Sequence, residues 1–131
     1  MNKRFVTGRK IRAEVLGEAA VRQRLDEADS FNRDFQELVT EYCWGAGWGR
    51  TALSRRDRSL MNLGMLAALN RPEEFALHVR AAMRNGVTRD DLEDALIQVA
   101  IYCGIPAGVE AFRIASGVLR EIDSEKSTHV D

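Results

Sequence analysis

The sequence is poor in the residues that cross-link a chain or bind metals. Among its 131 residues are two cysteines and two histidines. Cys43 and Cys103 lie far apart, so they form neither a CxxC redox pair nor a cluster with zinc-ligand spacing. We therefore expect two reduced thiols, as in cytoplasmic proteins, and no metal site.

Excess charge of one sign and long apolar runs are also missing. The 19 Lys and Arg residues oppose 20 Asp and Glu residues, and the basic side chains are scattered, which argues against nucleic acid or an anionic membrane as a partner. No run approaches the roughly 20 apolar residues of a membrane span. The N-terminal segment is too charged for a secretory signal. These absences predict a soluble, cytoplasmic protein.

Sequence motifs of the common cofactor enzymes do not occur. The chain has no GxGxxG, P-loop, HExxH or GxSxG pattern. If the protein is an enzyme, the class that is left is cofactor-free acid–base or electrostatic catalysis on a small anion. We accordingly expect neither a cofactor nor a metal.

The apolar residues that are present repeat with helical spacing almost everywhere, and no stretch alternates as a strand does. Both prolines, Pro72 and Pro106, are placed to begin helices. The pattern predicts one all-α domain of about six helices over residues 1–122. A polar, frayed tail is expected over residues 123–131.

One predicted helix carries an apolar stripe and ends at a glycine-rich segment. The stripe consists of Phe31, Phe35, Leu38, Val39 and Tyr42. This spacing predicts a helix face for burial, closed by Gly45. The following GAGWGRTAL segment is expected to be a loop that presents large side chains.

His78 is the first candidate for chemistry. It stands among apolar residues on a predicted helix, and Glu74 lies one turn earlier on the same face. A carboxylate at this spacing is able to hold the ring and favour its role as a general acid or base. The alternative is a structural histidine, with Glu74 in a weak surface ion pair.

The second candidate is the segment WGAGWGRTALSRRDRSL. Trp44 and Trp48 supply aromatic walls, and Arg50 and Arg58 supply guanidinium groups that suit a small organic carboxylate. Arg55 and Arg56 fall in a first helical turn and are weaker candidates. The alternative is that the tryptophans belong to the core or to a subunit interface.

The third candidate is the IYCGIPAG segment. Tyr102 precedes a break at Gly104, and a helix then begins near Ile105 and Pro106. Free N–H groups at such a helix start suit an anion or an oxyanion. A plain kink between two helices would look the same in sequence.

Taken in order, these segments resemble one enzyme family. The chain reads FNRDFQELVTEYCWG..W.R..L..R.RSL and then ALNRPEEFALHVRAAMRNGVTRDDLEDALIQVAIYCGIPAG.EAF. The combination of WGxxWxR, RxRSL, ExxxH and YCGIPA resembles the 4-carboxymuconolactone decarboxylases of the protocatechuate branch of the β-ketoadipate pathway. The resemblance runs from about residue 5 to about residue 120.

This resemblance implies the all-helical, alkylhydroperoxidase D-like fold and a ring-shaped homo-oligomer, a hexamer or a trimer. Peroxidatic members of that superfamily carry a CxxC motif with a histidine four residues later. Aligned through His78, the two thiol positions fall on Arg71 and Glu74, which excludes thiol–disulfide chemistry there.

The resemblance also implies a substrate, a carboxylated lactone that loses CO2 without a cofactor because its own ring accepts the electrons. The expected roles are an arginine anchor for the acetate arm, an aromatic wall, a proton donor held by a carboxylate, and donors to the enolate oxygen. The anchor is expected at Arg50 or Arg58, and the aromatic wall at Trp44 and Trp48. The expected proton donor is His78, held by Glu74. The expected donors to the enolate oxygen are Tyr102 or the backbone at Gly104 and Ile105. Two alternatives stay open: a relative that acts on another small lactone or keto acid, and a non-catalytic binding module.

Overall fold

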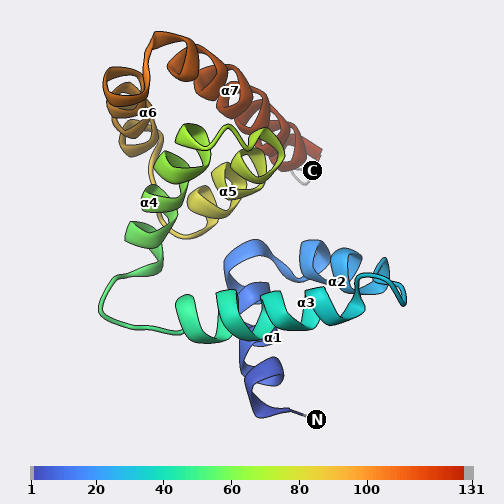
Figure 1. Cartoon of the computed structure of the whole chain (residues 1–131). Coiled ribbons are helices and arrows are strands. Elements are labelled where there is room, and N and C mark those ends of the chain that lie inside the picture. Colours follow the sequence, from blue (N-terminus) through green and yellow to red (C-terminus); the bar gives the residue numbers. More distant parts are fainter. Residues whose placement is uncertain (1, 129–131) are drawn as a thin grey trace. The chain divides into compact units, whose positions relative to one another are not determined.

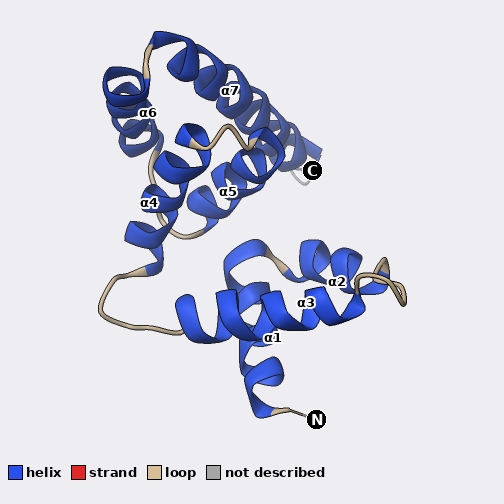
Figure 2. Cartoon of the chain, in the orientation of Figure 1, coloured by secondary structure: helices blue, strands red, loops and turns tan. Residues whose placement is uncertain are grey.

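The computed structural model describes residues 2–128, and this part of the chain contains helices and loops but no strand (Figure 2). Its α-helices are α1 (Lys3–Leu16), α2 (Glu18–Asp26), α3 (Arg33–Val39), α4 (Arg55–Ala68), α5 (Pro72–Arg84), α6 (Arg89–Cys103) and α7 (Ile105–Thr128). A π-helix, η1 (Thr40–Gly47), directly follows α3. The predicted all-α class is confirmed.

The helices group into two compact units (Figure 1). Unit 1, Met1–Arg55, holds α1, α2, α3 and η1; unit 2, Arg56–Asp131, holds the helices from α4 onward. A single helical domain over residues 1–122 stays a prediction. The candidate residues divide between the units: the tryptophans, Arg50 and Arg55 belong to unit 1, and the remaining candidates belong to unit 2.

In unit 1, α1 packs along η1 at very short range. A Cβ atom added to Gly8 would collide with the carbonyl oxygen of Thr40, and one added to Gly49 would collide with the carbonyl oxygen of Gly45. Glycine at these positions therefore allows the backbones to approach in a way that alanine would prevent.

The segment after α3 differs from the expected helix and loop. Gly45 does not end a helix, because η1 continues through it to Gly47. The N–H of Trp48 bonds to the carbonyl of Cys43, five residues earlier, at 3.0 Å, which is the wide π-type turn. Trp44 is therefore carried by η1, Trp48 directly follows it, and both side chains are buried.

The predicted burial of the apolar stripe is wrong for the isolated chain. Phe31 is 95 % exposed, and Phe35, Leu38 and Tyr42 are exposed as well. Phe35 and Leu38 lie on α3, whereas Phe31 precedes that helix in a turn and Tyr42 follows it in η1. Within the described residues, these four side chains are exposed. Helical spacing identifies residues that lie together, and it does not identify what packs against them.

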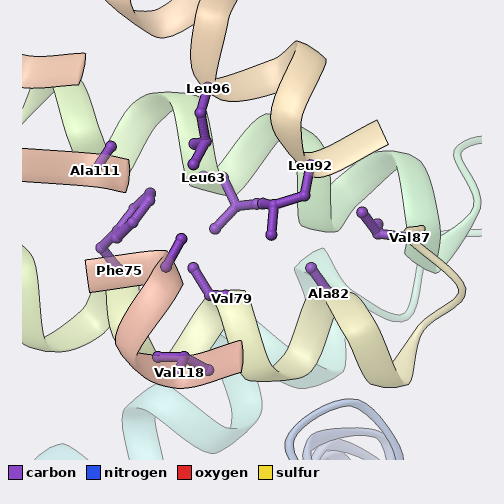
Figure 3. Packing of buried hydrophobic residues seen from close by; sticks show 10 residues of the cluster. Leu63, Phe75, Val79, Ala82, Val87, Leu92, Leu96, Ala111 and Val118 are labelled. Atoms are coloured by element: carbon purple, nitrogen blue, oxygen red, sulfur yellow. The ribbon is translucent and has the colours of Figure 1, made fainter. Parts of the chain in front are cut away.

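Unit 2 is built around one apolar cluster (Figure 3). The fully buried members include Leu63 of α4, Phe75 and Val79 of α5, and Leu96 of α6, and Val118 of α7 is buried with them. Helix α7 packs against both α5 and α6. The cluster thereby fixes α5, the helix that carries His78.

Local sequence signals account for the helix starts in unit 2. Pro72 occupies the first turn of α5, where its missing N–H costs no hydrogen bond. Thr88 and Asp91 form a complete capping box at the start of α6. Gly104 has φ of 106°, a conformation that favours glycine, and it separates α6 from α7.

We expect Asp91→Asn to lower the thermal stability at neutral pH and to lose this effect in acid. The backbone and side chain of Thr88 and the Arg56 side chain lower the pKa of Asp91 from 3.8 to about 2. Because the folded pKa is the lower one, the stabilisation is present above pH 3.8 and disappears as the pH falls through about 2.

Thermal unfolding followed by circular dichroism from neutral pH down to about pH 2 checks this expectation. Asp90→Asn, in the same first turn, is the matched control and should have a small effect. A difference between wild type and Asp91→Asn that stays constant across the whole pH range would contradict the assignment.

The C-terminal helix extends past the expected boundary at residue 122. Helix α7 continues to Thr128, and residues 129–131 of the predicted tail lie outside the described residues. Two ion pairs explain the extension: Arg80 of α5 contacts Glu125 at 2.9 Å, and Arg89 of α6 contacts Asp123 at 2.6 Å. Composition alone does not reveal these partners, because they come from other helices.

Candidate functional site

His78 lies in the middle of α5 and is buried, with 8 % of its surface exposed. Its helix neighbours Phe75, Val79 and Ala82 belong to the core of unit 2 (Figure 3). The ring therefore projects from a helix that packing holds rigidly, as a group that transfers a proton to a bound molecule requires.

Glu74 lies one turn before His78 but is exposed. No hydrogen bond or ion pair joins its carboxylate to His78 within residues 2–128, which differs from the expected pair. The physical reason is its place in the first turn of α5, where a carboxylate is stabilised by the helix N-terminus while it stays in water. The role of Glu74 as the group that holds the ring stays a prediction.

The two tryptophans form a stacked pair in unit 1. Their ring centroids are 5.2 Å apart, and the ring planes meet at 22°. The exposed fractions are 4 % for Trp44 and 7 % for Trp48. The two rings therefore form a buried stacked pair, a geometry that aromatic side chains favour.

Two arginines of the WGAGWGRTALSRRDRSL segment form ion pairs with nearby carboxylates. Arg55 pairs with Glu14 at 2.7 Å, and Arg56 pairs with Asp91 at 2.8 Å. These two guanidinium groups are engaged by carboxylates of the protein itself. Arg50 is exposed and Arg58 is half-buried.

The α6–α7 turn has the expected break at Gly104, but its side chains face outward. Tyr102 is 80 % exposed, and Ile105 is exposed as well. The N–H of Gly108 bonds to the carbonyl of Gly104 at 3.2 Å. The N–H groups of Ile105 and Ala107 belong to the first turn of α7 and lack partners within that helix.

A hollow of about 310 Å³ lies in unit 2 where α4 ends and where α5 and α7 begin. Its walls are largely apolar and include Phe75 and Ile114, and Arg71, Asn70 and Glu110 contribute the polar groups. The volume fits a small organic molecule. His78 is not among the residues that line this hollow, although it lies on the same helix.

Arg71, which the sequence marks only as the match to a thiol position, lies at the hollow. Arg71, Glu74 and His78 lie at i, i+3 and i+7, and therefore share one face of α5. Its guanidinium donates to the carbonyl of Leu69 at 3.2 Å. The Asn-Arg-Pro sequence indicates this position, because a residue directly before a helix-starting proline lies at the N-terminus of the helix.

Comparison with known proteins extends what this geometry indicates. The family model described as the carboxymuconolactone decarboxylase family matches residues 33–117. The chain belongs to the carboxymuconolactone decarboxylase family.

Relatives within and around this family include two that are named as decarboxylases. A 4-carboxymuconolactone decarboxylase of Acinetobacter baylyi is 38 % identical over 120 residues, which covers 92 % of this chain and 90 % of the relative. A nitrosuccinic acid decarboxylase of Metarhizium robertsii is 38 % identical over 118 residues, covering 90 % and 82 %. An uncharacterised 15.0 kDa protein of Paracoccus denitrificans is 30 % identical over 90 residues, 66 % of each chain.

The matched range of the family model contains all the candidate residues of both units. Within residues 2–128, no three His, Cys, Asp or Glu side chains are grouped so that they could hold a metal ion. Cys43 and Cys103 are both free and exposed. In the same part of the chain, no helix is long and apolar enough to cross a membrane.

Proposed function

We propose that this member of the carboxymuconolactone decarboxylase family converts 4-carboxymuconolactone to the 3-oxoadipate enol-lactone and CO2 without a cofactor. The observation that carries the proposal is the 38 % identity to a named 4-carboxymuconolactone decarboxylase over 92 % of the chain. The aromatic pair of unit 1 and the rigidly held histidine of unit 2 are each of a chemical type that the reaction needs.

The structure of the substrate explains why side chains and backbone N–H groups can catalyse the loss of CO2 without a cofactor. Its leaving carboxylate is attached to the ring carbon γ to the lactone carbonyl, next to the ring double bond. When CO2 departs, the electron pair spreads through that double bond onto the carbonyl oxygen. The protein has to stabilise this dienolate and deliver a proton to the carbon α to the carbonyl, and both tasks suit acid–base side chains and N–H donors.

We assign the roles as follows. Trp44 and Trp48 form a wall against the unsaturated ring, and His78 donates the proton. The enolate oxygen is held by N–H groups after Gly104, at Ile105, rather than by the exposed Tyr102. A guanidinium must bind the acetate arm and not the departing carboxylate, because stabilising the leaving group in the ground state would slow its loss.

The test of the proposed function is direct. Purified, metal-stripped protein is mixed with the lactone, and the loss of its ultraviolet absorbance is followed together with CO2 release. We expect the two signals to proceed together. A folded protein that leaves the lactone unchanged would refute the proposal and would favour a non-catalytic binding module or another substrate.

A second substrate class has its own support, because the Metarhizium robertsii relative is named a nitrosuccinic acid decarboxylase and is equally 38 % identical. Loss of CO2 from a carbon that bears a nitro group leaves a nitronate, another anion whose charge resides on oxygen. Both substrates carry a second carboxylate for an arginine to bind. Competition between the lactone and nitrosuccinate in one assay, compared through kcat/KM, decides which is preferred.

We expect that replacing the arginine that binds the acetate arm raises KM for the lactone. Arg50→Lys, Arg58→Lys and Arg71→Lys are compared, because lysine keeps the charge but loses the two-pronged geometry. The anchor's variant should raise KM by about tenfold or more while kcat changes less. Arg55→Lys, whose guanidinium pairs with Glu14, is the matched control. Unchanged KM in all three variants would place the carboxylate site elsewhere.

The proposal includes a cytoplasmic homo-oligomer, a hexamer or a trimer, with the carboxylated lactone as its small-molecule partner. The exposed apolar residues support self-association, since Phe31, Phe35 and Tyr42 in unit 1 and Ile101 in unit 2 would otherwise face water. Light scattering coupled to size-exclusion chromatography measures the number of copies. A monomer at micromolar concentration would contradict this part.

A further inference from the structure

Arg12 is buried at the contact between α1 and η1, and no role has yet been given to it. Its exposed fraction is 5 %, and its Nη1 atom donates to Oγ1 of Thr40 and to Oε1 of Gln36, at 3.2 Å in each case. Within the described residues no carboxylate pairs with it, and its Nε atom has no hydrogen-bond partner. Burial, and next the positive charge of Arg24, lower the pKa of Arg12.

Such an arrangement is a poor way to stabilise a fold. Transferring a guanidinium out of water is costly, and two neutral acceptors offset this cost only in part. An apolar side chain of similar length would fill the same space without the cost. The position of the charge therefore calls for an explanation other than packing.

The two acceptors of Arg12 mark the place where the helix changes type. Gln36 lies in the last turn of α3, and Thr40 is the first residue of η1. The hydroxyl of Thr40 also donates to the carbonyl of Gln36 at 2.7 Å. One guanidinium thus bridges the last α-helical turn and the first π-helical turn from the side of α1.

Gly8 of α1 also contacts Thr40, the first residue of η1. Gly8 lies four residues before Arg12, on the same face of α1, and its backbone touches the carbonyl of Thr40 so closely that a Cβ would not fit. Thr40 is therefore held from α1 by a close backbone contact and by a charged hydrogen bond. Trp44 and Trp48 follow one and two turns later, so the registration of Thr40 sets where their rings lie.

We propose that Arg12 is a positioning residue, which clamps the start of η1 and so holds the Trp44–Trp48 pair in the geometry that receives the substrate ring. The proposal rests on the proposed function for the role of the tryptophan wall. The clamp itself is a property of unit 1 alone, and it is measured without substrate.

The readout of the clamp is the exciton couplet that two stacked indoles give in circular dichroism. The variants Trp44→Phe and Trp48→Phe each keep a single indole, so their spectra serve as references without the couplet. Arg12→Met should lose most of the couplet while the free energy of unfolding stays the same or rises, because a buried charge is replaced by an apolar chain. Arg12→Lys, which keeps a charged donor, should restore much of the signal.

Thr40→Val gives an independent route to the same result, since it removes an acceptor of Arg12 with little change in shape. Arg9→Met is the matched control: Arg9 lies on the same helix but pairs with exposed Glu18, at 2.7 Å, so the couplet should persist. An undiminished couplet in both Arg12→Met and Thr40→Val would overturn the clamp.

Kinetics then separate the two proposals. With an active wild type, Arg12→Met should lower kcat/KM by about ten- to a hundredfold, because a small displacement of a substrate wall is costly to the reaction. Loss of the couplet with unchanged kcat/KM would overturn the positioning role. A wild type inactive on the lactone would refute the proposed function, while the couplet would still decide whether Arg12 holds the pair.

Discussion

Replacing His78 with glutamine should lower kcat on the lactone by about 10²- to 10⁴-fold, the contribution of a well-placed general acid. Glutamine approximates the size of the ring and keeps hydrogen-bonding groups, but it does not deliver a proton at ordinary pH. His78 is buried on a helix whose neighbouring residues form the core of unit 2. The substitution should thus remove the chemistry while the fold is kept.

Steady-state kinetics measure this effect, and the pH profile identifies its cause. For the wild type, kcat should fall on the alkaline side as the imidazole loses its proton. The small residual rate of His78→Gln should lack this limb. Turnover within about threefold of wild type, in a variant with the normal number of subunits, would remove His78 from the mechanism.

Glu74→Gln is the informative companion, since the structure leaves Glu74 exposed and not bonded to His78. If substrate binding brings the Glu74 carboxylate to the His78 ring, Glu74→Gln should lower kcat. It should also change the pH at which kcat decreases on the alkaline side. An unchanged profile would show that the ring is held by other groups, and it would leave the role of His78 intact.

Phe75→Ala should produce the second large effect, a loss of about 3 to 5 kcal/mol in the free energy of unfolding. Phe75 is 2 % exposed and packs with Leu63, Leu96 and Ala111 inside unit 2 (Figure 3). Removing its ring takes away buried apolar surface and leaves a cavity that the surrounding helices fill only in part. A loss of this size is a large fraction of the stability of an ordinary domain.

Urea unfolding with linear extrapolation gives the magnitude. Phe75→Leu, which keeps much of the volume, should cost less than about 1.5 kcal/mol and serves as the graded control. Because Phe75 also lines the hollow beside Arg71, the alanine variant should enlarge that hollow as well. An alanine variant within about 1 kcal/mol of wild type would show that unit 2 is not organised around this ring.

Much of the secondary structure was predictable because its signals are local. The proline at the start of α5, the capping box of Thr88 and Asp91, and the glycine between α6 and α7 each act within a few residues. The π-helix was not predictable in the same way. Its first residue, Thr40, contacts Arg12 and Gly8 of α1, which lie far from it in sequence.

The candidate site was predictable as a set of residue types and less so as an arrangement. His78 and Glu74 fall on one face of a helix as their spacing requires, yet their carboxylate–imidazole bond is absent from residues 2–128, since spacing does not fix a rotamer. Tyr102 was chosen for its chemistry, and the structure turns it toward solvent. The sequence pattern predicts no site role for Arg71, although Arg71 lines the hollow where three helix ends meet.

The sequence by itself determined the all-helical class, the helix starts at Pro72 and after Gly104 and, through its motifs, the family. These properties depend on contacts between residues close in the chain or on the identity of single residues. The tertiary structure alone decided which apolar faces are covered, where a π-turn replaces an α-turn, and which charges are buried. Those outcomes depend on side chains that meet only after distant helices pack, so no local pattern records them.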